Sequence, residues 1–273
     1  MGGPKQRVDV LLVGRGLCET REKARMAVMA GRVRVNGQTV DKPGQRVNED
    51  AALEVLAGLP YVSRGGLKLE KALAVFEIDL RSKVVLDVGA STGGFTDCAL
   101  QHGAAAVIAV DVGYGQLAWK LRCDERVTVL ERTNIRHLTA DRLPRPADFA
   151  VIDVSFISLA LVLPCLEELI TPQACGVALI KPQFEAGRNR VGKKGVVRDP
   201  EVHREVLFHV CRVVEERRWG VRGLDYSPVK GPEGNIEFLL YFDRVNPTTM
   251  DLAAEIREVV RRAHNELDAG SRK

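Results

Sequence analysis

The sequence predicts an α/β protein in which a doubly wound parallel sheet follows a small basic α+β module. Five short apolar runs each end in a charged residue, and these residues are Asp87, Asp111, Glu131, Asp153 and Lys181. Their separations of 24, 20, 22 and 28 residues leave room for a helix between strands, as in repeated βαβ units. Continuous apolar runs such as KVVLD and FAVID are typical of buried parallel strands. Because ligands bind outside the carboxyl ends of such strands, the five charged residues mark the predicted site.

Further elements complete this sheet. Two later apolar runs, VRGLDYS and NIEFLLYF, flank a turn-rich segment and predict a final antiparallel pair, which brings the sheet to seven strands. A helix is predicted for LKLEKALAVF before the first strand, because its apolar residues recur at one-face spacing. A last helix is predicted near the C-terminus, with Thr248 and Asp251 as its capping box.

Residues 1–56 are predicted to form the small basic module. Two short helices are expected, RVDVLLVGRGL and REKARMAVMA, the second capped by Thr20. Alternating residues around Asn36-Gly37 predict a β-hairpin, and AALEVL predicts another strand. Residues 1–46 contain ten Lys and Arg but four Asp and Glu, a net charge of +6 against +4 for the whole chain. Residues 57–66 are predicted to be a linker, and residues 67–273 the large domain.

The composition argues against several classes of protein. A hydrophobic content of 45% over 273 residues is ample for a globular core. The six cysteines form no C-x-x-C pair and have no histidine at metal-ligand spacing, so we predict no metal site and no disulfide framework. There is no apolar signal core and no run of about 18 apolar residues. We therefore expect a cytoplasmic monomer that does not bind a membrane.

A glycine-rich turn, D-V-G-A-S-T-G-G-F-T at 87–96, follows the first strand of the large domain. Its glycines permit a tight turn and a close approach of a ligand to the backbone, but their spacing matches neither G-x-G-x-x-G nor a P-loop. The turn resembles motif I of S-adenosylmethionine methyltransferases, which implies that Asp111 accepts the ribose hydroxyls and that Asn134 contacts adenine. Alternatively, the glycines form an ordinary turn and the aspartate caps a helix. The predicted cofactor-binding residues are Asp87, Gly89, Ala90, Ser91, Gly93, Gly94, Phe95, Asp111, Asn134 and Asp153.

Lys181 ends the apolar run VALIK directly before a proline, and three roles are open to it: surface cation, phosphate contact or catalytic base. A ribose hydroxyl is a poor nucleophile that benefits from a base, yet free lysine, with a pKa of about 10.4, is almost always protonated at pH 7. Burial and a second cation favour the neutral amine, and carboxylates orient it. Lys68, Asp153 and Glu237 are available as such partners near the same sheet edge, although Lys71 is an alternative to Lys68.

Longer motifs resemble two known modules. Four motifs in the basic module resemble the S4 RNA-binding module. In chain order they are R-x-D-x-x-L-x-x-x-G-L, T-R-x-x-A, G-x-V-x-V-N-G and K-P-G. Seven motifs in the rest of the chain resemble the TlyA family, in which an S4 module precedes an FtsJ-like domain. They are S-R-G-G-L-K-L at 63–69, L-D-V-G-A-S-T-G-G-F-T at 86–96, V-D-V-G-Y-G-Q-L-A-W at 110–119, E-R-T-N at 131–134, D-V-S-F-I-S-L at 153–159, K-P-Q-F-E at 181–185 and N-I-E-F at 235–238.

This resemblance implies a Rossmann-like methyltransferase sheet, S-adenosyl-L-methionine as the cofactor, and 2′-O-methylation of cytidine in 16S or 23S ribosomal RNA or both. It also implies a catalytic tetrad of Lys68, Asp153, Lys181 and Glu237. Lys181 would be the base, Asp153 and Glu237 would position it, and Lys68 would favour its neutral form or hold the ribose.

RNA contacts are predicted in the basic module and in the loop 187–199, GRNRVGKKGVVRD, which has five cations and one acid. Both are either phosphate-contacting surfaces or ordinary solvated faces, and the S4 resemblance favours the former. The predicted RNA-binding residues are Arg7, Arg21, Lys23, Arg25, Arg32, Arg34, Arg64, Arg188, Arg190, Lys193 and Lys194.

Three other functions are open. A non-catalytic RNA-binding or ribosome-assembly factor would keep the fold without turnover. Some relatives carry the label haemolysin, but the sequence has no apolar or strongly amphipathic membrane segment. Methylation of a small molecule would give the S4-like module no role.

Overall fold

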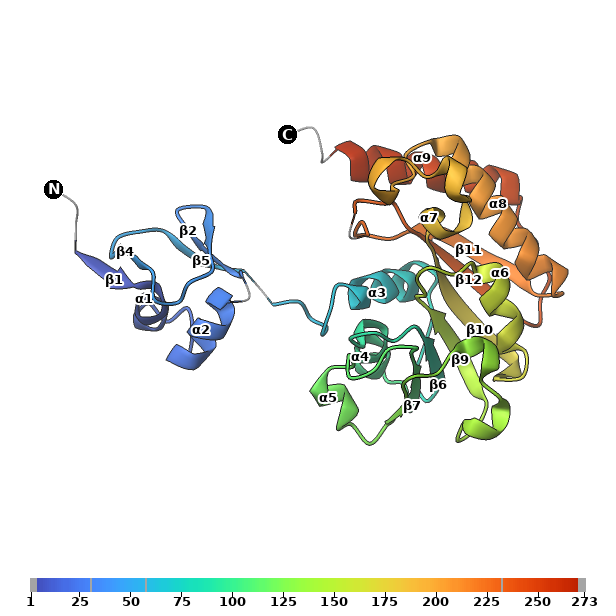
Figure 1. The fold of residues 1–273 in the computed structure, drawn as a ribbon, viewed down its shortest axis with the longest axis horizontal. Helices are drawn as coiled ribbons and strands as arrows, with labels where there is room; N and C mark the ends of the chain where they lie inside the picture. Colours follow the sequence, from blue (N-terminus) through green and yellow to red (C-terminus); the bar gives the residue numbers. More distant parts are fainter. Residues whose placement is uncertain (1–3, 30, 57, 232, 270–273) are drawn as a thin grey trace. The chain divides into compact units, whose positions relative to one another are not determined.

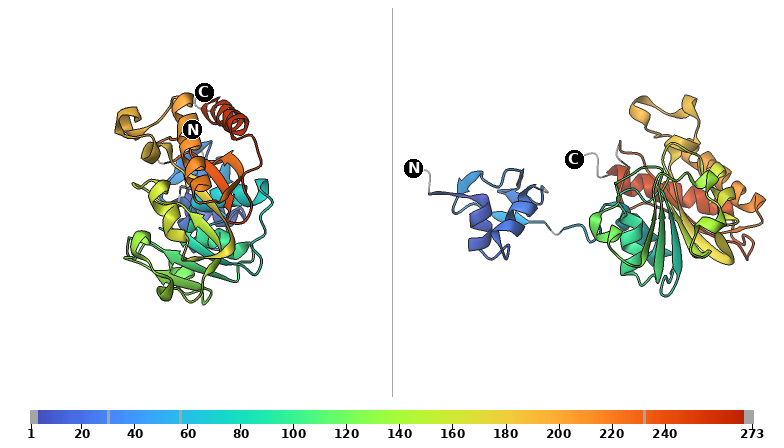
Figure 2. Two further views of the ribbon diagram at one scale, coloured as in Figure 1. Left: turned by 90° about the vertical axis from the view of Figure 1, so that its right-hand side faces the viewer. Right: turned by 60° about the horizontal axis from the view of Figure 1, so that its bottom comes forward.

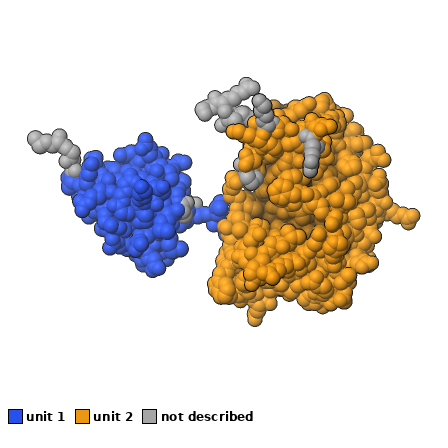
Figure 3. Space-filling model, in the orientation of Figure 1, with its two compact units in different colours: residues 1–60 blue, residues 61–273 orange. Residues whose placement is uncertain are grey.

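The computed structural model describes residues 4–29, 31–56, 58–231 and 233–269 (Figure 1). The chain forms two compact units, residues 1–60 and residues 61–273, which Figure 3 shows in separate colours. The boundary lies inside the expected linker 57–66. Residues 61–66 belong to the second unit, because Tyr61 is buried and a helix begins at Gly65. Asp97 holds this segment, since its Oδ2 accepts a 2.8 Å hydrogen bond from the Val62 N–H.

The first unit packs two helices against short strands. Its elements are β1 (Lys5–Arg7), α1 (Val8–Gly14), α2 (Arg21–Met29), β2 (Val33–Val35), β3 (Gln38–Val40), β4 (Arg46–Asn48) and β5 (Leu53–Val55). β2 pairs antiparallel with β3 and β5, and β1 pairs antiparallel with β4. The predicted hairpin turns at Asn36 and Gly37, which both have positive φ. Thr20 caps α2 as predicted, by accepting a 3.2 Å hydrogen bond from the Lys23 N–H.

The second unit is built on a seven-stranded sheet, as predicted. Its strands are β6 (Val84–Val88), β7 (Ala106–Val110), β8 (Val127–Leu130), β9 (Ala147–Ile152), β10 (Ile170–Ile180), β11 (Gly220–Tyr226) and β12 (Phe238–Asp243). They lie in the order β11-β12-β10-β9-β6-β7-β8. β6 to β10 are parallel, whereas β12 runs antiparallel to both β10 and β11. The last strand of the sequence is therefore inserted between β10 and β11.

Helices cover both faces of the sheet (Figure 1, Figure 2). On one face α3 (Gly65–Val75), α4 (Gly94–Gln101) and α5 (Trp119–Arg122) bury one apolar cluster. On the other face α6 (Leu159–Val162), α8 (Pro200–Glu216) and α9 (Leu252–Ala269) bury the second cluster. Strand residues alternate between these cores, so that Phe238 and Leu240 face one and Leu239 faces the other. This arrangement confirms the predicted doubly wound fold.

Short elements occupy the loops at the strand ends. They are α7 (Pro182–Glu185) directly after β10, and the 3₁₀ turns Ile135–His137, Ala140–Arg142, Leu163–Leu166, Arg188–Arg190 and Lys193–Gly195. Within the described ranges, no helix is long and apolar enough to span a membrane.

The predicted capping box of the last helix is wrong in one of its two members. Asp251 Oδ1 does cap α9, because it accepts hydrogen bonds from the N–H groups of Ala253 and Ala254 at 3.0 and 3.1 Å. The Thr248 hydroxyl instead accepts a 3.0 Å hydrogen bond from the Val221 N–H. Thr248 therefore fastens the loop before α9 to strand β11.

Candidate active site

A cavity of about 270 Å³ lies at the carboxyl edge of the large sheet, where β6, β9 and β10 end. Four segments that are distant in sequence converge on it: the start of α3, the glycine-rich turn after β6, the end of β9 and the end of β10. The loop before β12 closes it. The lining residues are Ser63, Arg64, Gly65, Lys68, Gly89, Ala90, Ser91, Thr92, Gly94, Phe95, Asp153, Ser155, Lys181, Val229, Lys230 and Gly231.

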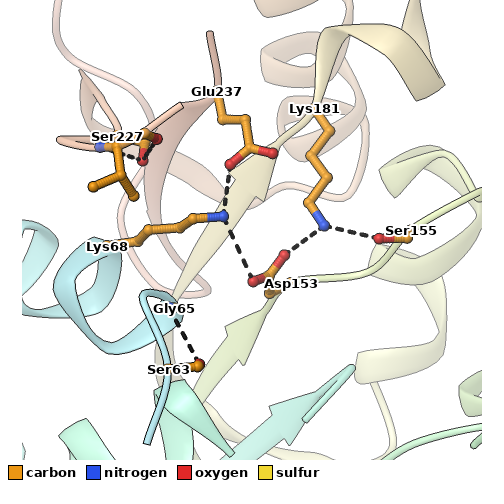
Figure 4. A network of polar contacts seen from close by, with 9 residues as sticks. Ser63, Gly65, Lys68, Asp153, Ser155, Lys181, Ser227 and Glu237 are labelled. Atoms are coloured by element: carbon orange, nitrogen blue, oxygen red, sulfur yellow. Dashed lines mark hydrogen bonds and ion pairs between the residues drawn. The ribbon is translucent and has the colours of Figure 1, made fainter. Parts of the chain in front are cut away.

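The four residues of the predicted tetrad form one polar network at this cavity (Figure 4). Lys181 Nζ lies 2.6 Å from Asp153 Oδ1, and Lys68 Nζ lies 2.6 Å from Glu237 Oε2. Lys68 Nζ is also 4.0 Å from Asp153 Oδ2, which joins the two pairs. The side chains of both lysines are 11% exposed, that of Asp153 is 20% exposed and that of Glu237 is 1% exposed. The network is thus largely withdrawn from water while Asp153 and Lys181 still face the cavity.

Lys68, and not Lys71, contacts the network. The Lys71 amine points to strand β11, where it lies 3.0 Å from Asp225 Oδ2 and donates a 2.7 Å hydrogen bond to the Tyr226 carbonyl oxygen. It also lies 3.4 Å from the centre of the Tyr226 ring, at a cation–π distance. These contacts engage Lys71 away from the cavity and decide between the two lysines.

Burial raises the pKa of the Glu237 carboxyl group. Its low exposure raises its pKa, because removal from water penalises the charged form, and the nearby Asp153 carboxylate acts in the same direction. The ammonium group of Lys68 opposes this shift through its charge and its hydrogen bond. Removing one partner of such a buried pair would leave an uncompensated charge, which costs about 3–5 kcal/mol. We therefore regard Lys68 and Glu237 as a unit.

Two glycines in the turn after β6 are required by close approaches. Gly89 has a φ of +87°, and a Cβ there would lie 2.6 Å from the Asp153 carbonyl oxygen. A Cβ on Gly94 would lie 2.3 Å from Ser63 Oγ. The sequence predicts that Gly94 allows a ligand to approach the backbone. In the structure, the absence of a side chain at Gly94 allows the start of α3 to pack against it. Gly89, Ala90, Ser91, Gly94 and Phe95 line the cavity, whereas Gly93, in the left-handed conformation, precedes α4.

Asp87 lies beneath this turn and is fully buried. Its Oδ2 accepts a 2.6 Å hydrogen bond from the Thr96 hydroxyl, and its Oδ1 has no hydrogen-bond partner among the described residues. Burial raises the pKa of Asp87 to about 7, opposed by the Thr96 hydroxyl and reinforced by the charges of Asp153 and Asp111. A carboxyl group whose pKa is raised well above its ordinary value by burial therefore lies directly behind the predicted cofactor turn.

Asp111 and Asn134 follow β7 and β8 but do not line the cavity. The Asp111 carboxylate accepts backbone hydrogen bonds from Ser91 at 2.7 Å and from Gly113 at 2.6 Å, so it holds the glycine-rich turn against the next loop. The Asn134 side chain accepts a 3.1 Å hydrogen bond from the Arg136 N–H and caps a 3₁₀ turn. Each carboxylate oxygen of Asp111 accepts one hydrogen bond here and retains capacity for another.

Two predicted RNA-binding arginines of the first unit share one buried carboxylate. Asp9, which is fully buried, lies 3.0 Å from Arg7 Nη2 and 3.1 Å from Arg21 Nε. The hydrogen bond from Arg7 lowers the pKa of Asp9 to about 2, and Arg21 adds to the effect. The arginine side chains are 43% and 58% exposed, so their remaining N–H groups are open to a ligand.

The other predicted RNA contacts are mostly exposed. In the first unit Lys23 pairs with Glu19, Arg34 lies 3.9 Å from Glu54, Arg25 is exposed and Arg32 is half-buried. In the second unit Arg64 and Lys194 are exposed and Arg190 pairs with Glu205. The side chains of Arg188 and Lys193 lie outside the described part of the structure.

Several residues for which the sequence predicted no role make contacts at the carboxyl edge of the large sheet. Ser155 Oγ accepts a 3.0 Å hydrogen bond from Lys181 Nζ. Phe156 is 90% exposed, has a φ of +64°, and packs at 5.0 Å between ring centres against Phe184. Glu185 accepts hydrogen bonds of 2.6 Å from the Ser158 hydroxyl and 2.8 Å from the Leu159 N–H, which ties α7 to the loop after β9. These residues lie in the motifs D-V-S-F-I-S-L and K-P-Q-F-E, but the sequence does not indicate how exposed their side chains are or what they contact.

Asn235, for which the sequence predicted no role, links the loop 187–199 to the segment before strand β12. It is 2% exposed, and its Oδ1 accepts a 2.9 Å hydrogen bond from the Val197 N–H while its Nδ2 donates a 2.9 Å hydrogen bond to the Gly195 carbonyl oxygen. Because Glu237 follows two residues later, the C-terminal end of the basic loop is held beside the tetrad.

Comparison with known proteins agrees with this fold. Residues 61–244 match the FtsJ-like methyltransferase family, and residues 6–53 match the S4 domain. The chain is 57% identical over 243 residues to the Bacillus subtilis protein named "Putative rRNA methyltransferase YqxC", covering 88% of this chain and 86% of that protein. It is 44% identical over 264 residues to the Mycobacterium tuberculosis 16S/23S rRNA (cytidine-2′-O)-methyltransferase TlyA, covering 96% of this chain and 98% of that one.

The solved structure of a "Putative hemolysin" from Streptococcus thermophilus matches with a TM-score of 0.78 and 48% identity over 99% of both chains. The predicted family is therefore confirmed by two independent domain matches in the expected order and by similarity along almost the whole chain. This protein belongs to the TlyA family, in which an S4 domain precedes an FtsJ-like methyltransferase domain.

Proposed function

We propose that this protein transfers a methyl group from S-adenosyl-L-methionine to the 2′-oxygen of a cytidine in ribosomal RNA, with Lys181 as the general base. The observation that carries the proposal is the Lys181 amine, 2.6 Å from Asp153, in a cavity that also contains the glycine-rich turn of motif I. The family supports the methyl transfer. The Mycobacterium tuberculosis relative, named for 16S and 23S rRNA and for cytidine 2′-oxygen, supports the acceptor.

The residues of the turn after β6 fit such a cofactor. Gly89, Ala90, Ser91 and Gly94 line the cavity, so a ligand there would lie against the backbone of the turn. Beneath the turn, the buried Asp87 has an Oδ1 without a hydrogen-bond partner among the described residues. Asp111 would accept the ribose hydroxyls with its remaining capacity, and Asn134 would contact the adenine edge. When bound, the cofactor supplies a methyl group on a positively charged sulfur, which needs no further activation.

The chain's own residues then manage the proton of the acceptor. Lys181, in its neutral form, would take the proton of the ribose 2′-hydroxyl as the oxygen bonds to the methyl carbon and the bond from that carbon to sulfur breaks, with the electron pair of that bond left on the sulfur as a neutral thioether. The ammonium so formed lies beside the Asp153 carboxylate, which stabilises the new charge without rearrangement. Lys68 and Glu237 anchor Asp153 from the other side, because Lys68 contacts both carboxylates. Holding the acceptor in line with the methyl group supplies the rest of the acceleration.

Features of each unit suit an RNA acceptor. Arg64 lines the cavity and is exposed, and the loop 187–199 is held beside Glu237 by Asn235. The exposed ring of Phe156 next to the Asp153 segment offers a face on which an unstacked base can stack. Asp9 holds two exposed arginines in the S4 domain, which suits phosphate contacts. A small-molecule acceptor would use none of these.

The test is to map 2′-O-methyl groups in 16S and 23S rRNA from subunits treated with the wild-type protein, with Lys181→Ala and with a Lys71→Ala control. We expect new methyl groups at cytidine with the wild type and the control. Lys181→Ala should bind S-adenosyl-L-methionine normally, with its single-turnover rate lower by about 10²–10⁴-fold. Full turnover of Lys181→Ala would refute the role of this lysine. Absence of methylation by a wild-type protein that binds both ligands would favour the non-catalytic RNA-binding alternative.

A further inference from the structure

We propose that Ser155, which is outside the Lys-Asp-Lys-Glu tetrad, sets the direction of the Lys181 lone pair and is a positioning residue for methyl transfer. The proposal rests on the function proposed above, because it matters only if Lys181 acts as a base. It adds a residue whose contribution can be measured separately from that of Lys181.

The contacts of the Lys181 amine carry the inference (Figure 4). The nitrogen is tetrahedral, with one bond to Cε and three other positions. Asp153 Oδ1 lies 2.6 Å from it, and Ser155 Oγ accepts a hydrogen bond from it at 3.0 Å. A neutral amine has two N–H groups and one lone pair, and a lone pair directed at a carboxylate oxygen would be repelled. When the two N–H groups face Asp153 and Ser155, the lone pair takes the remaining position.

Asp153 alone would not give this selection. One acceptor holds one N–H group, and the lone pair and the second N–H group can then exchange places by rotation about the bond to Cε. Only one of these two arrangements directs the lone pair at an acceptor placed in the third position. The hydroxyl of Ser155 removes the unproductive arrangement, because it provides an acceptor where the second N–H group must lie.

The loop that carries Ser155 is held in place from two directions. The N–H of Asp153 donates a 2.9 Å hydrogen bond to the Val88 carbonyl oxygen, which fixes the start of the loop to β6. Glu185 binds Ser158 and the Leu159 N–H at the other end. Between them Phe156 has a positive φ, a conformation that costs a non-glycine residue of order 1 kcal/mol or more and persists only where its surroundings impose it. Ser155 is therefore presented at a defined point, although it is itself exposed.

The experiment compares Ser155→Ala and Ser155→Thr with the wild type and Lys181→Ala, using full-length protein, S-adenosyl-L-methionine and ribosomal subunits. Single-turnover methyl transfer is measured at saturating substrates, together with KM for the subunits and cofactor affinity by calorimetry. Because Ser155 is exposed, both variants should fold, which circular dichroism will check. We expect Ser155→Ala to lower the rate constant by about 10–100-fold, as expected for a misplaced reacting group, with KM and cofactor affinity within twofold of wild type. Ser155→Thr retains the hydroxyl and should recover most of the rate.

Three outcomes would overturn the proposal. A full rate for Ser155→Ala alongside an inactive Lys181→Ala would show that Lys181 is needed but that Ser155 does not orient it. A faster Ser155→Ala would show that the hydroxyl donates to the lone pair and blocks it. A loss of cofactor affinity in both Ser155 variants, without rescue by threonine, would show that Ser155 only supports the loop. Failure of the proposed function is a different result, in which Lys181→Ala itself keeps full activity.

Discussion

Both units contain an aspartate held between two cations, and Asp9 in the first unit differs from Asp153 in the second in the type of cation and in the exposure of that cation. In the S4 domain, Asp9 lies between Arg7 and Arg21, whose side chains are about half exposed. In the methyltransferase domain, Asp153 lies between Lys68 and Lys181, whose side chains are almost buried. Asp9 lies at nearly equal distances of 3.0 and 3.1 Å from its two arginines, whereas Asp153 lies 2.6 Å from Lys181 and 4.0 Å from Lys68.

We propose that this difference suits the first site to phosphate binding and the second to proton transfer. An arginine side chain stays protonated in proteins, and its remaining N–H groups can contact phosphate, so Asp9 presents two permanent charges to solvent. A lysine amine can lose its proton, and burial next to a carboxylate places that amine where a proton can be taken up and stabilised. Substitutions of these side chains and one change of pH test this comparison.

The largest effect is expected from Lys181→Arg. Arginine keeps the positive charge and the contact with Asp153 but cannot act as a base, so the single-turnover rate should fall by about 10²–10⁴-fold with cofactor affinity retained. The matched exchange in the other unit, Arg21→Lys, keeps a cation where only charge matters and should change RNA affinity by less than about tenfold. Rates come from quenched-flow methylation assays and affinities from filter binding. A Lys181→Arg variant with more than a tenth of wild-type activity would show that the site needs charge rather than proton transfer.

The next effect concerns Asp87, a fully buried aspartate that forms no ion pair with any described residue. Its pKa in the folded protein is about 7, against 3.8 as the ordinary value, so between about pH 4 and pH 7 the folded protein holds a proton that the unfolded chain has lost. Its contribution to stability is therefore greatest at low pH and falls as pH rises through this range, by up to roughly 4 kcal/mol. Asp87→Asn does not titrate and should remove this dependence.

The measurement is the free energy of unfolding of wild type and Asp87→Asn from pH 4 to pH 8 in urea, with the difference between the two proteins as the readout. Wild type should lose stability relative to the variant as pH rises. A difference that is constant with pH would show that Asp87 is not protonated in the folded state. Asp9 has its pKa lowered to about 2 and acts in the opposite direction, since its contribution is present above about pH 4 and is lost as pH falls toward 2.

The smallest effect is expected for the arginines of the S4 domain. Arg7→Ala and Arg21→Ala should each remove one phosphate contact and make the slope of log K against log salt less steep by about 0.7–0.9. Arg81→Ala is the control, because Arg81 is an exposed arginine paired with Asp79 outside the predicted RNA surface. Binding of rRNA fragments across a salt series gives the slopes. Unchanged slopes for both S4 variants would assign RNA binding to other residues.

Much of the fold could be predicted from local patterns. The five parallel strands were recognisable because buried parallel strands are continuous apolar runs that repeat at the βαβ period. The hairpin at Asn36-Gly37 and the cap at Thr20 followed from turn and capping chemistry, which depends on residues only a few positions apart. Thr248 was misassigned because its hydroxyl bonds to Val221, on a strand distant in sequence. The same limit applied to Ser155, since nothing local shows that its neighbour is a lysine from the next strand.

Local sequence patterns were enough to predict the order of the elements and the set of charged residues at the carboxyl ends of the strands, because both depend on short-range periodicity. The tertiary structure decided which charges meet. Lys68 and Lys71 lie one turn apart on α3. Lys68 contacts Glu237 and Lys71 contacts Asp225. Both contacts depend on the insertion of β12 between β10 and β11. Lys68 and Glu237 are 169 residues apart in the chain, so their contact depends on strand order. Local patterns carry no information about that order.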